Sequence, residues 1–261
     1  MCRWAAYIGK PLYLSDILIA PEHSLIDQSS CANKGKARLN ADGFGLAWYS
    51  QKKEPGVFKD ILPAWSNINL ASLADHIRSR LFLAHIRAST GTEVSRTNCH
   101  PFIVGRWSFI HNGLIGGFER QRKLADMAIP GPLYHHRKGT TDSEAFFLIA
   151  LSLGLETDPH GAMLKTIQCF QDFTTDQLHM RLSIAMSDGY RLYAVRYSTE
   201  LSAPSLFYKM HQSKDGYSVA SEPYDTDFEV WNVVSNNSFC TFHAKDAPII
   251  VPLIAQNYTA A

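Results

Sequence analysis

The chain contains 261 residues, and its composition of 46% hydrophobic and 19% charged residues is ordinary for a soluble globular protein. Its 25 basic and 24 acidic residues nearly cancel, so no net charge draws the chain toward nucleic acid or an anionic membrane. No apolar run approaches the roughly 18 residues of a membrane span, and the first residues lack the pattern of a secretory signal. We therefore expect neither nucleic acid nor a membrane among the partners of this protein.

Short strands alternate with a few helices along the sequence. In chain order, the predicted elements are a strand around 46–49, a helix at 70–80, strands at 81–88 and 107–111, helices at 118–128, 142–154 and 160–172, a hairpin at 181–197, and strands at 230–234 and 239–242. The hairpin turns at Ser187-Asp188-Gly189, and the last two strands are expected in the same layer as the hairpin. Loops are predicted at 28–38, 51–57, 128–140 and 211–217.

Helices interspersed with many strands favour an α+β fold in which stacked sheets are covered by helices, although the pattern does not give the strand order. No internal repeat or long linker divides the chain, so one domain is expected over residues 1–261. The predicted helix at 142–154 is preceded by Thr141 and carries Glu144 in its first turn. This spacing is that of a capping box, in which each side chain accepts a hydrogen bond from the backbone N–H of the other residue.

The five cysteines stand at positions 2, 31, 99, 169 and 240, an odd number without any C-x-x-C pair. This spacing argues against a disulfide framework and against a zinc site. The sequence also lacks a Gly-rich strand-to-helix turn followed by Lys-Ser/Thr, so we expect no metal and no organic cofactor. A free thiol survives best in a reducing compartment, so the cytoplasm is the expected location.

Cys2 is a candidate nucleophile because it follows the initiator methionine. Removal of Met1 would leave a thiol and a free α-amine on the same residue. An α-amine has a pKa of about 7.7–8.0, so near neutral pH a useful fraction is able to accept the thiol proton. The resulting thiolate is the reactive form of cysteine. Taken alone, a cysteine at position 2 is usually incidental.

The segment His111-Asn112-Gly113 follows a predicted apolar strand and has two interpretations. Asn-Gly is the strongest short signal for a hairpin turn. Alternatively, the Asn112 side-chain amide and the Gly113 backbone N–H would form an oxyanion hole that stabilises the charge developing during acyl transfer.

Arg87 and Asp142 are candidates for recognition of an amino acid's zwitterionic head. Arg87 lies at the end of a predicted buried strand, where its charge requires an anionic partner, either a ligand carboxylate or an internal acid. Asp142 lies in the first turn of a predicted helix, where it would accept hydrogen bonds from a ligand ammonium or simply favour the helix dipole. His100 lies in a predicted loop and would line the same pocket or serve a structural role.

Several segments, in this order, resemble the class II glutamine amidotransferases, whose nucleophile is an N-terminal cysteine. They are Met1-Cys2-Arg3, Asn40-Ala41-Asp42-Gly43-Phe44-Gly45, His85-Ile86-Arg87-Ala88-Ser89-Thr90, Asn98-Cys99-His100-Pro101-Phe102, His111-Asn112-Gly113 and Thr141-Asp142-Ser143-Glu144. The sequence is most similar to a stand-alone subgroup that includes the amidotransferase-like subunit of a fungal glutathione-degradation complex and a γ-glutamyl hydrolase of ergothioneine biosynthesis.

The resemblance implies a four-layer αββα sandwich of two antiparallel sheets. It also implies that Cys2 is the nucleophile and that Asn112 and Gly113 form the oxyanion hole. In the same way, Arg87 and Asp142 would hold the α-carboxylate and α-amine of a γ-glutamyl group.

Thr90 and His100 would line the pocket for that group. The sequence departs from better-known members at Ala88, where they carry tryptophan, and at Gly91, where they carry histidine. The resemblance therefore leaves the leaving-group specificity undefined.

The implied reaction is cleavage of the γ-amide of glutamine or of another γ-glutamyl compound through a thioester on Cys2. Two arrangements are compatible with the sequence. The protein either supplies ammonia to a separate synthase subunit, or hydrolyses γ-glutamyl amides or peptides by itself or within a complex with a peptidase partner. A non-catalytic amino-acid-binding protein with the same fold is a third alternative. A serine hydrolase is disfavoured because no G-x-S-x-G motif is present.

Overall fold

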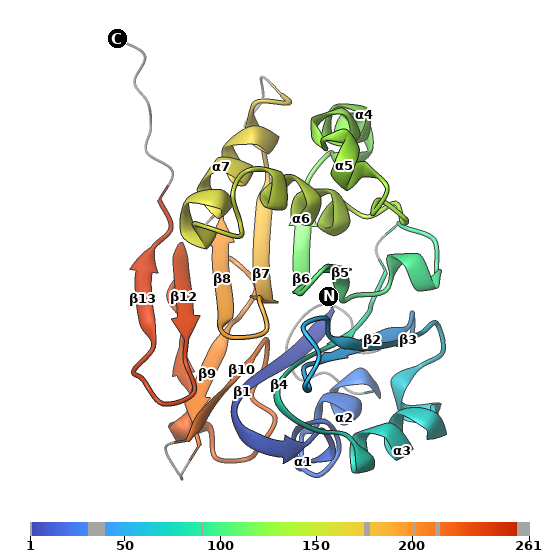
Figure 1. Ribbon diagram of the computed structural model, residues 1–261, viewed down its shortest axis with the longest axis vertical. Coiled ribbons are helices and arrows are strands. Elements are labelled where there is room, and N and C mark those ends of the chain that lie inside the picture. The colour runs from blue at the N-terminus through green and yellow to red at the C-terminus, as the bar shows by residue number, and fades with distance from the viewer. Residues whose placement is uncertain are drawn as a thin grey trace.

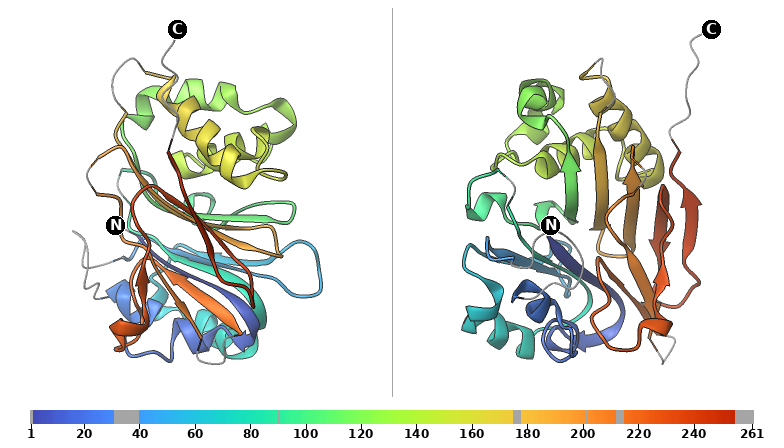
Figure 2. Two further views of the ribbon diagram at one scale, coloured as in Figure 1. Left: turned by 90° about the vertical axis from the view of Figure 1, so that its left-hand side faces the viewer. Right: turned by 180° about the vertical axis from the view of Figure 1, so that it is seen from behind.

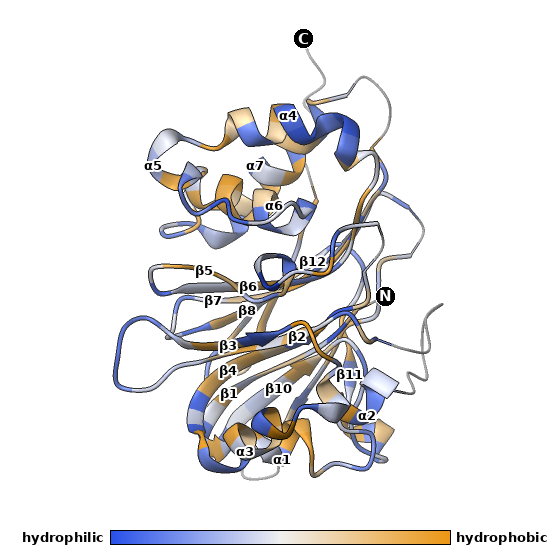
Figure 3. Cartoon of the chain, turned by 90° about the vertical axis from the view of Figure 1, so that its right-hand side faces the viewer, coloured by the Kyte–Doolittle hydropathy of each residue, from blue (hydrophilic) through white to orange (hydrophobic). Residues whose placement is uncertain are grey.

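The computed structural model describes residues 2–30, 40–89, 91–174, 178–200, 202–211 and 215–254. Two antiparallel sheets lie face to face, and helices cover the outer face of each sheet (Figures 1 and 3). From top to bottom, Figure 3 shows helices, a sheet, a second sheet and further helices. This arrangement confirms the predicted four-layer αββα sandwich.

The first sheet has seven strands, and in spatial order they are β11 (Asn232–Val233), β9 (Phe207–Met210), β10 (Gly216–Ala220), β1 (Arg3–Tyr13), β4 (Arg78–Ile86), β2 (Phe44–Trp48) and β3 (Gly56–Asp60). The second sheet has six strands, in the order β13 (Ile249–Pro252), β12 (Ser238–Phe242), β8 (Leu192–Ser198), β7 (Met180–Ser187), β6 (Trp107–Ile115) and β5 (Phe102–Val104). All of these strand pairs are antiparallel.

The two helical layers lie at opposite ends of the molecule (Figure 2). The layer against the seven-stranded sheet contains α1 (Ser15–Leu18), α2 (Leu25–Ser30) and α3 (Ile68–His76). The layer against the six-stranded sheet contains α4 (Phe118–Ala128), α5 (Gly131–Tyr134), α6 (Asp142–Ser152) and α7 (Pro159–Gln171). The described residues also form the 3₁₀ turns η1 (Ala64–Ser66), η2 (Arg96–Asn98) and η3 (Phe228–Val230). Within the described ranges, no helix is long and apolar enough to cross a membrane.

Strand β1 shows why the central strands are apolar along most of their length. Trp4, Ala6 and Ile8 face the second sheet, whereas the alternate residues Ala5 and Tyr7 face the helices on the other side. Successive side chains of a strand point to opposite faces, so a strand with cores on both sides needs apolar residues at every position. This double burial places β1 at the centre of the molecule.

Most predicted elements occur where the sequence placed them. Helix α4 occupies the predicted range, α6 and α7 match within two residues, and β7 and β8 form the predicted hairpin. The helix predicted at 70–80 is too long, because α3 ends at His76 and Arg78 already begins β4 by pairing with Tyr13. The observed strand β4 therefore begins three residues before the start predicted for the strand at 81–88.

The strand predicted at 230–234 does not lie in the same sheet as the hairpin, so this part of the prediction is wrong. The short strand β11 pairs with β9 in the seven-stranded sheet, whereas β12 pairs with the hairpin strand β8 in the six-stranded sheet. The predicted loop at 128–140 contains α5, and those at 51–57 and 211–217 end where β3 and β10 begin. Residues 31–39 and 212–214 lie outside the described residues.

Candidate active site

Cys2 lies immediately before β1, beside the end of β4. Arg3 pairs with Ile86, and the Sγ atom of Cys2 accepts a hydrogen bond from the backbone N–H of Ala88 at 3.4 Å. Burial raises the pKa of the Cys2 thiol, whereas the Ala88 N–H and the positive charge of Arg87 act in the opposite direction. A thiol with a raised pKa is protonated at neutral pH, so it needs a nearby base to become a nucleophile.

The backbone next to Cys2 is held by residues from the far end of the sequence. The Nε atom of Arg3 lies 2.8 Å from a carboxylate oxygen of Glu222, and both side chains are only 4% exposed. Nη1 of Arg3 donates back to the carbonyl oxygen of Cys2 at 3.1 Å. The hydroxyl of Ser221 accepts the N–H of Trp4 at 3.0 Å, and the Ser221 N–H donates to the Trp4 carbonyl. These bonds fix the start of β1.

The Asn112-Gly113 pair lies inside β6, so the hairpin-turn interpretation is wrong. The signal failed because β6 continues through this pair to Ile115 and pairs with β7 along its whole length. On its other side β6 pairs with β5 only as far as Phe109, so beyond that residue no strand of the described part of the chain pairs with this edge of β6.

Backbone geometry directs the Gly113 N–H to this open edge. The Ile115 N–H donates to Oδ2 of Asp142 at 3.0 Å instead of to β7. N–H groups two residues apart in a strand point to the same edge, so the Gly113 N–H faces the same side. The adjacent Asn112 side chain is buried, and its Oδ1 atom has no hydrogen-bond partner within the described residues. The open edge thereby offers the Gly113 N–H as a donor, whereas the unpartnered atom of Asn112 is an acceptor.

Arg87 is buried and makes no ion pair with any residue that the structure describes, so an internal salt bridge does not explain it. Its Nη2 atom donates to the Thr92 hydroxyl at 2.7 Å, to the Glu93 carbonyl at 3.0 Å and to the Ser89 hydroxyl at 3.2 Å. Neutral oxygens orient the guanidinium without cancelling its charge. A buried cation of this kind favours an anionic ligand.

Asp142 lies at the first position of α6 and lines a pocket of about 290 Å³ together with Gly113, Thr92 and Thr141. One oxygen of its carboxylate accepts the Ile115 N–H, and the other accepts the backbone N–H of the next residue at 2.7 Å. Arg87 donates a hydrogen bond to the hydroxyl of Thr92, which forms part of the pocket wall. The structure therefore brings Gly113 and Asp142 to one pocket, whereas Cys2, Arg87 and Asn112 are not among its lining residues.

The predicted pocket residue His100 lies elsewhere. Its ring is buried against His85, with 4.2 Å between the ring centroids, and it is absent from the lining of the 290 Å³ pocket. Burial holds the pKa of His100 well below its ordinary value, which favours the neutral ring. Nε2 of His85 in turn lies 3.2 Å from the carbonyl oxygen of His111, the residue before Asn112. Thr90, the other predicted lining residue, lies outside the described residues.

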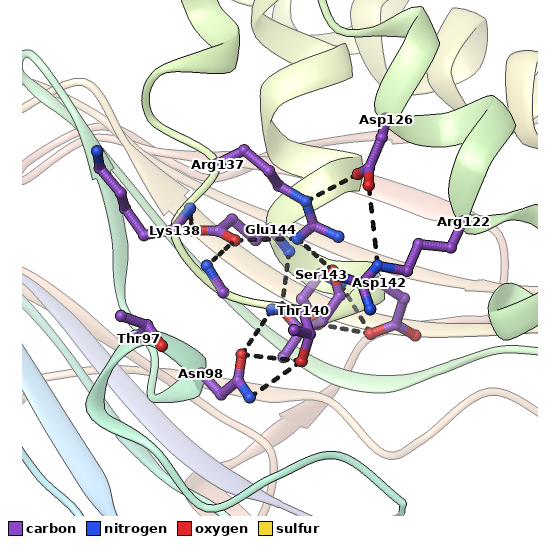
Figure 4. Close-up of polar contacts among 12 residues, drawn as sticks. Thr97, Asn98, Arg122, Asp126, Arg137, Lys138, Thr140, Asp142, Ser143 and Glu144 are labelled. Atoms are coloured by element: carbon purple, nitrogen blue, oxygen red, sulfur yellow. Dashed lines mark hydrogen bonds and ion pairs between the residues drawn. The ribbon is translucent and has the colours of Figure 1, made fainter.

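Sequence reasoning missed Asn98, which joins the two sides of the pocket. Its Nδ2 donates to the carbonyl of Glu93 at 3.0 Å, and that carbonyl also accepts a hydrogen bond from Arg87. Its Oδ1 accepts the backbone N–H of Thr140 at 2.8 Å (Figure 4). Asn98 thereby links the loop that holds Arg87 to the segment that leads into Asp142. In the segment 98–102 only the histidine suggests a site residue, because a bond across 42 residues has no local signal.

The capping box at α6 is half confirmed. The Thr141 hydroxyl accepts the Glu144 N–H at 3.2 Å, as predicted. The Glu144 carboxylate does not return to Thr141 and instead accepts Arg137 Nη1 at 2.9 Å and the Gly139 N–H at 2.8 Å (Figure 4). Arg137 also contacts Asp126 on α4 at 3.0 Å. A buried guanidinium attracts this carboxylate more strongly than a backbone N–H does.

We expect Asn98→Ala to weaken substrate binding, because the two pocket walls would no longer be joined. The substitution leaves buried polar groups without partners, which should cost about 1–3 kcal/mol of folding free energy. KM for the substrate should rise several-fold with a smaller change in kcat. The matched control is Asn67→Ala, which removes another buried asparagine that caps α3 at 2.9 Å from the Leu70 N–H. That variant should lose stability with KM unchanged, and an equal rise in KM in both variants would contradict the bridging role.

The sequence profile of the family described as "Glutamine amidotransferases class-II" matches residues 20–241. The chain belongs to this family. A probable glutamine amidotransferase of Saccharomyces cerevisiae, DUG3, is 33% identical over 99% of this chain and 86% of its own length. A γ-glutamyl-hercynylcysteine sulfoxide hydrolase of Mycolicibacterium smegmatis is 31% identical over 96% of this chain and 99% of its own length.

Solved structures agree with this assignment. A glutamine aminotransferase class-II domain protein of Silicibacter pomeroyi is 41% identical, with a TM-score of 0.76 over 97% of this chain and the whole of that one. The glutamine phosphoribosylpyrophosphate amidotransferase of B. subtilis has a TM-score of 0.67 over 97% of this chain and 49% of its own, at 12% identity. The second likeness shows the fold alone. This class II amidotransferase is thus an enzyme with the fold of the N-terminal-nucleophile glutamine amidotransferases.

Proposed function

We propose that this class II amidotransferase cleaves the γ-amide of glutamine or of another γ-glutamyl compound, with Cys2 as nucleophile. The observation that carries the proposal is the position of Cys2. Its sulfur contacts the N–H of Ala88 at 3.4 Å, and the charge of Arg87 lowers the pKa of its thiol whereas that of Asp142 raises it. Strand β6, which carries the open edge at Gly113, lies against β1 and β4.

The proposed reaction needs Met1 to be removed, so that Cys2 has a free α-amine. That amine accepts the thiol proton, directly or through water, and the sulfur attacks the γ-carbonyl carbon. The Asn112 side chain and the Gly113 N–H stabilise the oxyanion of the tetrahedral intermediate. The C–N bond then breaks, and the leaving amine takes the proton that the α-amine had accepted. Water hydrolyses the resulting thioester and releases glutamate with the thiol restored.

The glutamate head is proposed to lie between two charges. Arg87 would pair with the α-carboxylate by exchanging its present hydrogen bonds to the 89–93 loop for the substrate. Asp142 would pair with the α-ammonium, which gives one fixed charge of each sign for a zwitterion. Thr90 is proposed to line this pocket. His100 is proposed to support it through His85 and the β6 backbone, since the ring lies away from the pocket.

Two forms of this function are compatible with the family and with the relatives of this chain. In the first, the enzyme hydrolyses γ-glutamyl amides or peptides by itself or with a peptidase partner, and the near full-length match to a relative named as a γ-glutamyl hydrolase favours it. In the second, it supplies ammonia from glutamine to a separate synthase. We further propose that the whole chain forms one catalytic domain. A catalytic thiol must stay reduced, so the cytoplasm is the proposed location.

A substrate panel tests the proposal and separates its two forms. Purified protein would be offered glutamine, glutathione and other γ-glutamyl peptides, and released glutamate would be measured. Turnover of peptides alone supports the hydrolase, and turnover of glutamine alone supports the ammonia donor. Binding of these compounds without glutamate release, even with a candidate partner present, would instead support a non-catalytic binding protein.

We expect Arg87→Lys to raise KM by about tenfold or more with a smaller effect on kcat. Lysine keeps the charge but loses the planar fork that binds a carboxylate through two parallel hydrogen bonds. The measurement is steady-state kinetics with the best substrate of the panel. The control is Arg122→Lys, an arginine on α4 that pairs with Asp126 at 3.8 Å on the surface. An unchanged KM in Arg87→Lys would remove Arg87 from the proposed binding site.

A further inference from the structure

A second cavity, of about 450 Å³, lies apart from the 290 Å³ pocket and shares no lining residue with it. The lining comes from the edge strands β3 and β5 of the two sheets, from α6 and from the segments around residues 96 and 138. Its apolar part is formed by Phe102, Val104, Phe147 and Leu148. Apolar walls with a few polar groups are the usual make-up of a small-molecule site.

Three cationic side chains line the same cavity, namely Lys59, Arg96 and Lys138. The side chains of Lys59 and Lys138 make no ion pair or hydrogen bond with any residue that the structure describes. Arg96 lies 3.7 Å from Asp60 and its side chain is 71% exposed, which makes this ion pair weak. Two ammonium groups are thus available to an anion.

Glu144 is the one carboxylate among the described lining residues, and it is already occupied. One oxygen accepts Arg137 Nη1 and the Gly139 N–H, and the other accepts the backbone N–H of Lys138 at 3.1 Å (Figure 4). In the same view the side chain of Lys138 extends away from Glu144. The Glu144 carboxylate therefore stabilises the loop before α6, and it forms no ion pair with Lys59 or with the side chain of Lys138.

Lys59 shows the electrostatic consequence of this arrangement. Its ammonium lies 5.2 Å from the centre of the Phe102 ring, and burial lowers its pKa to about 8. Burial outweighs the favourable charge of Glu144, which makes no ion pair with Lys59, so an anion beside the ammonium would restore a favourable interaction. The ring face of Phe102 contributes an attraction of its own, but a smaller one.

We propose that this cavity binds a small organic anion with an apolar body. The anionic group would lie between Lys59 and Lys138, and the body would pack against Phe102 and Phe147. The proposal does not depend on the function proposed for Cys2, because none of these residues belongs to that site. It adds a second ligand site to the enzyme.

Matched probes test this proposal. 2-Naphthoate combines an apolar body with a carboxylate, and 2-naphthamide has nearly the same shape without the charge. Binding of each to the full-length protein would be measured by saturation-transfer NMR and by calorimetric titration. We expect naphthoate to bind at least about tenfold more tightly than naphthamide, because a charge-assisted hydrogen bond is lost in the amide. Equal binding of the two probes would overturn the proposal.

Variants then locate the binding site. Lys59→Met and Lys138→Met keep most of the stem and remove the charge, so each should weaken naphthoate binding about tenfold, whereas Lys59→Arg should retain it. Lys165→Met is the control, since Lys165 is exposed on α7. Lys138 is also exposed, so its variant remains informative if Lys59→Met does not fold. Loss of binding in Arg87→Lys, with no loss in the two lysine variants, would assign the probe to the other pocket and contradict the proposal.

Discussion

Cys2→Ala is expected to lower turnover by about 10⁴-fold or more while the fold and substrate binding are retained. The substitution removes the sulfur atom that accepts a hydrogen bond from the Ala88 N–H. The pKa of this thiol is lowered by the charge of Arg87 and raised by that of Asp142. Loss of a catalytic nucleophile in other hydrolases has effects of this size. Because Cys2 is only half-buried and alanine is smaller, no steric strain arises. The measurements are glutamate release and calorimetric binding of the substrate.

Cys169→Ala provides the matched control for the nucleophile. Cys169 is also half-buried and free, but it lies on α7 in the outer helical layer. Its loss should leave turnover unchanged and cost little stability. A Cys2→Ala protein that folds and retains more than about 1% of wild-type turnover would exclude the covalent route, since residual catalysis without a nucleophile is far smaller.

Asn112→Ala is expected to lower kcat by about 10²–10³-fold with little change in KM. A donor to an oxyanion acts chiefly in the transition state, so its removal affects kcat rather than ground-state binding. Asn112 is better suited to this test than Gly113. A Cβ atom at Gly113 would lie 1.8 Å from the carbonyl oxygen of Arg181, so any substitution there would disturb β6 itself.

Ser183→Ala is the control for Asn112→Ala. Ser183 lies on β7 directly opposite Asn112 and donates to the Ser205 carbonyl at 3.4 Å. Its loss should reduce stability modestly without a comparable effect on kcat. If Asn112→Ala changes only KM or only the unfolding temperature, Asn112 is not an oxyanion donor.

The periodic elements and their broad order could be predicted from the sequence because they depend on neighbouring residues. The helices at 118–128 and 142–152 and the hairpin at 187–189 are examples. Local signals failed where tertiary contacts were stronger. The Asn112-Gly113 pair has the composition of a turn, yet β7 pairs with it and keeps it extended. Glu144 has the position of a capping residue, yet the buried Arg137 attracts its carboxylate.

The parts of the site that escaped prediction are bonds between distant segments. Glu222 reaches Arg3 across 219 residues, and Asn98 reaches Thr140 across 42. Sequence patterns are recognised over windows of about 10–20 residues, so they cannot include pairs this far apart. Arg87 was correctly expected to carry a buried charge, but the loop oxygens that orient it became apparent only in three dimensions.

The most direct test of the central claim is an intact-mass measurement on active protein, quenched with acid during turnover of its best substrate. We predict a chain lighter by one methionine, of which a fraction is heavier by one γ-glutamyl acyl group, and no such adduct in Cys2→Ala. An active protein that retains Met1, or an acyl group that persists in Cys2→Ala, would contradict the proposed mechanism.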